Sequence, residues 1–289
     1  MFYRCNITAV PGLFAAVMLM ALAGCGSQSG RQMPVCIGVR SADEAASLLR
    51  LQSCSTNSLK AGGHCELEYY TQGKKRREDF LFKMWLQLPD KIYIQGQIAL
   101  DPQAVAAGSN GQDFWLTLRT KEISGYWWGQ WSGGSRQDGL FLSPALVLEF
   151  FGAAETAAGQ DWTLSAAGAF DVLTKNSTDG MAAVRMHIYN CDHLVRKIEH
   201  FDPNGNISAA AESDGYMKLP GGCSVPSVIK VIRYISGTEQ TAAVAAFKFD
   251  FIKPTDFTQE QAKRLFDRPS TTGFKHVRKM SNAGQVELP

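Results

Sequence analysis

The feature that most constrains this chain is a period of two in its apolar residues. In the range 80–88 every even-numbered position is apolar: Phe80, Phe82, Met84, Leu86 and Leu88. Successive side chains of a β-strand point to opposite faces, so this run predicts a strand with one strongly apolar face. Pro89 and Asp90 are typical of a turn, and residues 91–95 then resume the alternation. A hairpin or closely paired meander is therefore expected.

The same alternation returns along most of the chain. A turn at residues 109–111 precedes a run in which Phe114, Leu116 and Leu118 share one face. Further strands are predicted at 126–131, 162–164, 183–190, 193–201, 227–234 and 243–252. Because most connections are too short for parallel crossovers, antiparallel pairing is expected. The predicted fold class is mainly β within an α+β arrangement.

Three short helices are predicted between these strands. Ser41 begins a capping box before an amphipathic helix over residues 42–52. Ser143 and Pro144 are typical of a helix start, and Gly152 of its end. A second capping box at Thr258 predicts a last helix to about residue 266.

The N-terminus has the features of an export signal. Arg4 precedes an apolar run of about fifteen residues that ends directly before Cys25, shorter than the roughly twenty that span a bilayer. Leu22-Ala-Gly-Cys25 resembles the lipobox of bacterial lipoproteins, whose cysteine is acylated and becomes the new N-terminus. Residues 1–24 are therefore predicted to be a lipoprotein signal peptide and Cys25 the lipidation site. An ordinary secretory signal whose cleavage site precedes a cysteine is the alternative.

The remaining chain is expected to be one anchored globular domain. Residues 25–40 are predicted to form the lipidated N-terminus and a flexible tether, 41–268 the domain, and 269–289 a polar C-terminal tail. The formal net charge of +2 is too small to favour nucleic acid, so no nucleic-acid partner is expected. The anchor predicts a place in the cell envelope, facing the periplasm. The outer membrane is favoured, because Gly26 is not the aspartate that retains enterobacterial lipoproteins at the inner membrane.

Five cysteines follow Cys25 in the predicted mature chain. They are Cys36, Cys54, Cys65, Cys191 and Cys223. An exported chain can form disulfides, and the favoured pairings are Cys54 with Cys65, which closes a short loop, and Cys191 with Cys223. Neither a CxxC pair nor zinc-finger spacing of histidines is present, so no metal site and no cofactor are expected.

The range 66–152 resembles LolA/LolB-type proteins, which carry or receive bacterial lipoproteins. The resemblance rests on three segments, residues 82–96, 108–115 and 140–152, in that order along the chain. It implies an incompletely closed, strongly curved antiparallel β-barrel whose apolar concave face is covered by short helices and holds acyl chains. The carrier of this type is not lipidated, so a lipobox makes this chain more similar to the lipid-anchored acceptor. Neither the lid-locking arginine nor the protruding apolar loop of the family has a counterpart here.

The predicted ligand-binding residues line the apolar faces of the strands and the second helix. They are Phe82, Met84, Leu86, Ile92, Ile94, Phe114, Leu116, Leu118, Phe150 and Phe151. Plain core packing is the alternative for each of them. The favoured function is a lipid-anchored envelope lipoprotein that binds an acyl chain or lipoprotein, in lipoprotein sorting or outer-membrane localisation. The alternative is a non-catalytic assembly lipoprotein with a filled core that binds envelope protein partners.

Three other groups of residues have both a functional and a structural interpretation. The aromatic cluster 126–131 is typical of a membrane interface or of residues alternating across a sheet, and the second is favoured. The basic run 74–77 is expected in a turn, where it either contacts anionic headgroups or is only solvated. His187, Asp192, His193 and His200 lie close together in the sequence, which is compatible with metal or acid/base chemistry, but they are expected at exposed strand ends. No catalytic motif is found, so no enzymatic activity and no catalytic residue are predicted.

Overall fold

The strands predicted from the alternation form one large sheet. The computed structural model describes residues 33–53, 58–71, 73–120, 123–131, 140, 142–153, 162–177, 179–220, 222–235, 237–238, 240–281 and 284–288. Within these ranges the sheet contains 15 strands in the order β17-β16-β6-β5-β4-β3-β2-β1-β15-β14-β11-β10-β9-β8-β7. Their bounds are β1 (Ser58–Thr71), β2 (Lys74–Gln87), β3 (Lys91–Ile98), β4 (Asp101–Asn110), β5 (Asp113–Arg119), β6 (Ser124–Gln130), β7 (Trp162–Ala167), β8 (Phe170–Asn176), β9 (Ala182–Tyr189), β10 (Val195–Phe201), β11 (Ile207–Ser213), β14 (Val228–Tyr234), β15 (Thr241–Pro254), β16 (His276–Ser281) and β17 (Gly284–Leu288). Strands β12 (Tyr216–Lys218) and β13 (Ser224–Pro226) form a separate ribbon.

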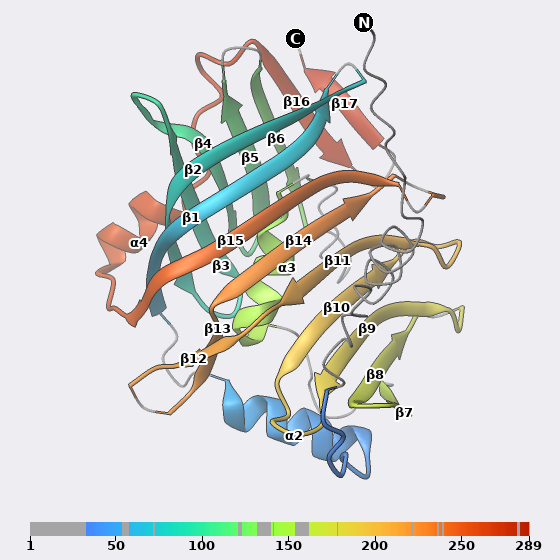
Figure 1. Cartoon of the computed structure of the whole chain (residues 1–289). Helices are drawn as coiled ribbons and strands as arrows, with labels where there is room; N and C mark the ends of the chain where they lie inside the picture. The colour runs from blue at the N-terminus through green and yellow to red at the C-terminus, as the bar shows by residue number, and fades with distance from the viewer. Residues whose placement is uncertain are drawn as a thin grey trace, which may run out of the picture. The chain divides into compact units, whose positions relative to one another are not determined.

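The sheet is curved and is not closed into a ring. Its strand order ends at β17 on one side and at β7 on the other, as Figure 1 shows. All pairings in the sheet are antiparallel except the parallel pairing of β16 with β6. The predicted architecture, a mainly β, incompletely closed antiparallel sheet with short helices, is confirmed.

The three predicted helices are present with the predicted caps. They are α2 (Ala42–Gln52), α3 (Pro144–Leu148) followed by the π-helical turn η1 (Glu149–Ala153), and α4 (Gln259–Phe266). The hydroxyls of Ser41, Ser143 and Thr258 each accept a hydrogen bond from a backbone N–H of the first turn, which satisfies a donor that the helix itself leaves free. In the described part of the chain, no helix is both long and apolar enough to cross a membrane.

The two faces of the sheet have different partners. The inner face is the one on which α3 packs, against β3, β4, β11 and β14, and all five residues of α3 are buried. The outer face is the opposite one. Trp85 and Tyr93 stack there with ring centroids 5.7 Å apart, next to clefts that they share with α4 and the segment after it. The main apolar core therefore lies between the inner face and α3.

Strand β4 was missed by the sequence analysis because its residues are small. Six of its positions are buried, and they include Val105 and Ala107 in the core. At Gly108 an added Cβ would lie 2.4 Å from the ring of Trp115 on β5, so the indole occupies the space of a side chain. Alanine and glycine have a low β propensity, so they give a weak strand pattern in the sequence. At Gly108 a small residue is needed because of Trp115, which only the fold brings next to it.

Both ends of the predicted domain need correction. Residues Val35–Pro289 form one compact unit, of which the tail predicted at 269–289 is a part. Its strand β16 pairs with β6, and the Tyr126 hydroxyl donates a hydrogen bond of 2.8 Å to the Pro269 carbonyl. The last residues of the predicted tether are also bound, because the Val39 N–H donates to the buried Asp171 carboxylate at 3.1 Å. These two segments have a polar composition, but their backbone N–H and C=O groups bond to the domain, and such contacts leave no pattern in the sequence.

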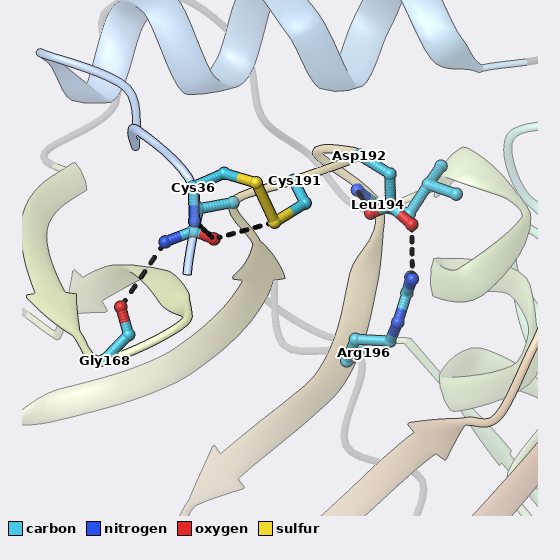
Figure 2. Close-up of a disulfide and its surroundings, with 7 residues drawn as sticks. Cys36, Gly168, Cys191, Asp192, Leu194 and Arg196 are labelled. Atoms are coloured by element: carbon cyan, nitrogen blue, oxygen red, sulfur yellow. Dashed lines mark hydrogen bonds and ion pairs between the residues drawn. A yellow bond between two sulfur atoms is a disulfide. The ribbon is translucent and has the colours of Figure 1, made fainter. Parts of the chain in front are cut away.

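Both predicted disulfide pairings are wrong. Cys36 is bonded to Cys191, and Figure 2 shows this bond joining the segment before α2 to the turn after β9. Cys65 is a free, buried thiol whose pKa is raised well above its usual value by burial. Cys223 is disulfide-bonded to a partner outside the described residues, and Cys54 also lies outside them. Sequence spacing favoured a short loop, whereas the fold joins residues 155 positions apart.

Candidate functional site

A cleft opens where α2 and the helical turn η1 meet the sheet. It has a volume of about 210 Å³ and lies between α2, η1, the start of β10 and the β12–β13 ribbon. Its apolar wall is made by Leu49, Phe150, Phe151, Met186, Leu194 and Val195. Phe150, Phe151 and Met186 also belong to the buried core, so the apolar wall is continuous with the inner face of the sheet.

The turn η1 places both phenylalanines at this cleft. Gly152 in η1 has a φ of 94°, in the left-handed region that glycine adopts without strain. A π-helical turn is uncommon and often occurs at functional sites. Phe151 packs edge to face on Phe249 of β15, with ring centroids 5.8 Å apart.

A buried ion pair joins η1 to the sheet beside the cleft. Glu149 Oε2 of η1 lies 2.9 Å from Nε2 of His200 on β10, and both side chains are less than a tenth exposed. The prediction that the histidines lie at exposed strand ends is therefore wrong for His200, which the fold directs to the inner face. A buried, hydrogen-bonded pair of this kind specifies one position for the turn that carries the phenylalanines.

The polar wall of the cleft contains hydrogen-bonding groups with fixed positions. The Gln52 amide donates to the Asp192 carbonyl at 2.8 Å, while its Oε1 atom is buried without a hydrogen-bond partner in the described structure. The Tyr216 hydroxyl donates to the Val195 carbonyl, and burial raises the pKa of Tyr216 to about 12. Arg196 lies over the Tyr216 ring and pairs with Asp192, as Figure 2 shows for the second contact. One wall of the cleft is thus apolar and the other carries hydrogen-bonding groups.

Only two of the ten predicted ligand-binding residues line this cleft, Phe150 and Phe151. The other eight point to the inner face and are at most 4% exposed; they are Phe82, Met84, Leu86, Ile92, Ile94, Phe114, Leu116 and Leu118. All ten belong to one apolar cluster with α3. That they contact an acyl chain stays a prediction. The cleft residues from α2 and β10 were missed, because no local pattern marks a wall assembled from elements about 140 residues apart.

The structural interpretation of the aromatic cluster is confirmed. Trp127 and Trp131 pack against the inner core, whereas Tyr126 lies on the outer face, edge to face with Phe274 at 5.3 Å. Trp128 lies under the Arg268 guanidinium, 4.0 Å from its ring centroid. The cluster therefore joins both faces of the sheet edge to their neighbours.

The basic run 74–77 does not lie in a turn but forms the start of β2. Lys75 Nζ is 2.9 Å from Glu68, and Arg77 lies 2.9 Å from Glu66 and 3.2 Å from Asp79. Lys75 and Arg77 are thus paired with carboxylates, mainly across the strand pair, which the linear sequence did not reveal.

His187 belongs to a second ion-pair cluster, on the outer face. Its Nε2 lies 2.9 Å from Oε2 of Glu199, and Lys197 Nζ lies 2.8 Å from the other carboxylate oxygen. The hydrogen bond from His187 lowers the pKa of Glu199 from 4.5 to about 2, with a further contribution from Lys197 and opposition from burial. In the described residues, no three His, Cys, Asp or Glu side chains converge as a metal ion would require.

This cluster predicts a pH-dependent contribution to stability. Because the pKa of Glu199 is lower in the folded chain, the stabilisation is present above pH about 4.5 and is lost as the pH falls towards about 2. We expect Glu199→Gln to lower the free energy of unfolding by on the order of 2 kcal/mol at neutral pH. Urea unfolding of both chains at several pH values measures this difference. A difference that does not shrink below pH about 4.5 would contradict the assignment.

Comparisons with known proteins concern the fold. No protein-family model matches the sequence, and no curated protein matches it. A DUF1329 family protein from Desulfovibrio piger superposes with a TM-score of 0.54 at 11% identity, over 77% of this chain and 96% of that one. The two chains share their fold over most of their length. The unclosed curved sheet that the resemblance implied is present, with α3 on its inner face, whereas α4 lies beside the outer face.

Two further matches have lower TM-scores. A LolA superfamily protein from Nitrosomonas europaea has a TM-score of 0.48 at 11% identity, over 77% of this chain and 97% of that one. A domain from Vibrio parahaemolyticus named for outer membrane lipoprotein sorting has a TM-score of 0.49 at 12% identity, with the same coverage.

Proposed function

We propose that this LolA/LolB-like chain is a non-catalytic envelope lipoprotein, anchored through acylated Cys25, that binds an acyl chain of a lipid or lipoprotein. The acyl chain enters at the cleft beside η1 and extends towards the inner face under α3. The role that follows is to receive or pass on lipoproteins during their sorting, at the outer membrane. The observation that carries the proposal is the cleft itself, since one wall is apolar and continuous with the core, while the other is polar.

The size of the cleft defines how an acyl chain would fit. Its volume of about 210 Å³ is below the roughly 300–1,000 Å³ of typical ligand sites, so it holds only part of a long chain. The rest of the chain would displace Phe150 and Phe151 with the η1 turn. Each buried CH₂ group contributes about 0.8 kcal/mol, which favours this exchange once several groups enter.

The surroundings of the polar wall suit the polar end of such a ligand. The free Oε1 of Gln52 accepts a hydrogen bond, and Arg50 supplies a cation at the same cleft. The Cys36–Cys191 disulfide is in keeping with an exported chain, because disulfides persist mainly in oxidising compartments. The lipobox at Cys25 supplies the anchor in this proposal.

An assembly lipoprotein with a filled core is the second candidate. The observation that favours it is the close packing of the inner face, where Met84, Leu86 and Leu116 are fully buried against α3 and its neighbours. Such a protein would bind its partners through surfaces and loops and would take up no acyl chain.

A matched pair of substitutions on α2 tests the proposal. Leu49 lines the cleft, whereas Leu51, two positions away, is 81% exposed. We expect the full chain with Cys25→Ser, which cannot be acylated, to bind a fluorescent fatty acid saturably. Leu49→Arg should weaken binding at least about tenfold, since a buried leucine contributes about 1.5–3 kcal/mol. Leu51→Arg should leave binding unchanged.

Two outcomes would contradict the proposal. A folded chain that takes up no fatty acid would favour the assembly protein. Equal loss of binding in Leu49→Arg and Leu51→Arg would show that the fatty acid binds elsewhere. Circular dichroism of both variants verifies that each remains folded.

A further inference from the structure

The outer face of the central strands carries lysines without carboxylate partners. They are Lys60 on β1, Lys83 on β2, Lys230 on β14, and Lys248 and Lys253 on β15. All except the half-buried Lys60 are exposed. None of the five forms an ion pair in the described part of the chain, in contrast to Lys75 and Arg77 of the basic run. In Figure 1, β1, β2, β15 and β14 run side by side in the middle of the sheet.

The strand register brings these lysines together around two exposed apolar side chains. Lys83 lies opposite Gly62, and Gly62 lies opposite Phe251, so the three share one row across β2, β1 and β15. In the next row, Leu81 and Lys248 lie on either side of His64. Leu81 is 64% exposed and Phe251 is 42% exposed, although both are large apolar residues. We call this surface, formed by the five lysines with Leu81 and Phe251, the basic face.

A glycine places the phenylalanine on this surface. A Cβ at Gly62 would lie 2.7 Å from the Phe251 ring, so the ring extends over the β1 backbone towards β2. Lys253 Nζ lies 5.9 Å from the centroid of the same ring. Aromatic rings with cations beside them are suited to a boundary between water and apolar material.

The carboxylates near the basic face do not cancel its charge. Asp79 and Glu66, in the row beyond Leu81, are bound by Arg77, and Asp79 also lies 3.6 Å from His64. Asp250, next to Phe251, is the one exposed carboxylate of this part of β15 that has no ion pair in the described residues. Asp256 shares a cleft with Lys60 and also has no ion pair in the described residues. Glu212, opposite Lys230, lies 3.9 Å from Lys197. Five lysines against two unpaired carboxylates leave the surface positive.

We propose that the basic face docks on an anionic lipid surface, with its lysines at the headgroups and Leu81 and Phe251 inserted between them. Lysine is depleted in protein–protein interfaces, whereas exposed lysines near anionic lipids each contribute favourably to binding, so a bilayer fits this surface better than a protein partner. Docking in this way leaves the cleft of the inner face on the side away from the bilayer. The assignment does not depend on acyl binding at that cleft.

Vesicle binding by the full chain with Cys25→Ser tests the proposal. The probes are vesicles of phosphatidylcholine alone and vesicles in which a third of the lipid is phosphatidylglycerol. We expect binding to the anionic vesicles that weakens as salt is raised. The triple variant Lys83→Gln, Lys248→Gln and Lys253→Gln should bind them about a hundredfold more weakly, at roughly fivefold for each lysine.

A second triple variant is the matched control. Lys175→Gln, Lys218→Gln and Lys275→Gln remove the same charge from other surfaces, and none of these lysines forms an ion pair in the described residues. This variant should bind anionic vesicles within about twofold of the parent chain. Equal weakening by both triple variants would overturn the proposal, because net charge alone would then explain binding. Equal binding to both kinds of vesicle would overturn it too. Absence of binding to anionic vesicles at low salt would also overturn it and would favour an acidic protein as the partner of the basic face.

Discussion

Replacing Phe82 by alanine is expected to lower the free energy of unfolding by about 3–5 kcal/mol. Phe82 is 3% exposed and packs edge to face on two other rings, Phe247 at 5.2 Å and Phe249 at 5.4 Å between centroids. Its removal takes a large apolar side chain from a close-packed interior and leaves a cavity that the sheet cannot fill by relaxing. Urea unfolding measures the difference.

Leu81→Ala is the control for this prediction. Leu81 is the preceding residue on the same strand, but it points to the outer face and is 64% exposed. Its truncation should change the free energy of unfolding by no more than about 0.5 kcal/mol. A small cost for Phe82→Ala would show that the inner face is loosely packed, which would favour an acyl-binding cavity under α3 over a filled core.

Removal of the Cys36–Cys191 disulfide is expected to have an effect of similar size. The bond joins residues 155 positions apart, so it restricts the unfolded chain strongly. A chain with Cys36→Ser and Cys191→Ser should lose about 3–5 kcal/mol of stability, if loop entropy dominates. The bond also holds the segment before α2 against β9, and the Cys36 N–H donates to Asn190 Oδ1 at 3.0 Å beside it. The α2 wall of the cleft should therefore become mobile.

Reductant provides the control for the disulfide. Added to the unmodified chain, it should destabilise at least as much as the double substitution, because the bond of Cys223 is reduced as well. Added to the double variant, it should cost only the contribution of that second bond. Unchanged stability of the double variant would contradict the structural role assigned to Cys36 and Cys191. Hydrogen exchange in α2 reports separately on the expected mobility.

The Glu149–His200 ion pair lies beside the cleft and fixes one of its walls. It joins η1 to β10, while the disulfide joins the segment before α2 to the turn after β9. Phe150 and Phe151, the residues that an entering acyl chain would displace in the proposed function, follow Glu149 directly in η1 and line the cleft. The ion pair thus fixes the turn that carries one wall of the cleft, whereas the disulfide fixes the chain that leads into α2.

The local sequence was sufficient to predict the class of fold. Alternation of apolar residues over 80–95 and 114–118 determined which side chains point to the core, because the period of a strand is a property of its backbone. The helix starts at Ser41, Ser143 and Thr258 were likewise predictable, since a cap acts within one turn. The resemblance to LolA/LolB-type proteins added the unclosed, curved form of the sheet.

Only the tertiary structure determined which distant residues and strands are neighbours. Cys36 meets Cys191, Glu149 meets His200, and β16 meets β6, all across large separations that no local period records. Lys75 and Arg77 of the basic run pair with carboxylates, whereas lysines scattered over four strands converge on one face. Local sequence determines the direction of a side chain, because that depends on its own backbone. Its partners depend on strand order and register, which arise only when the whole sheet assembles.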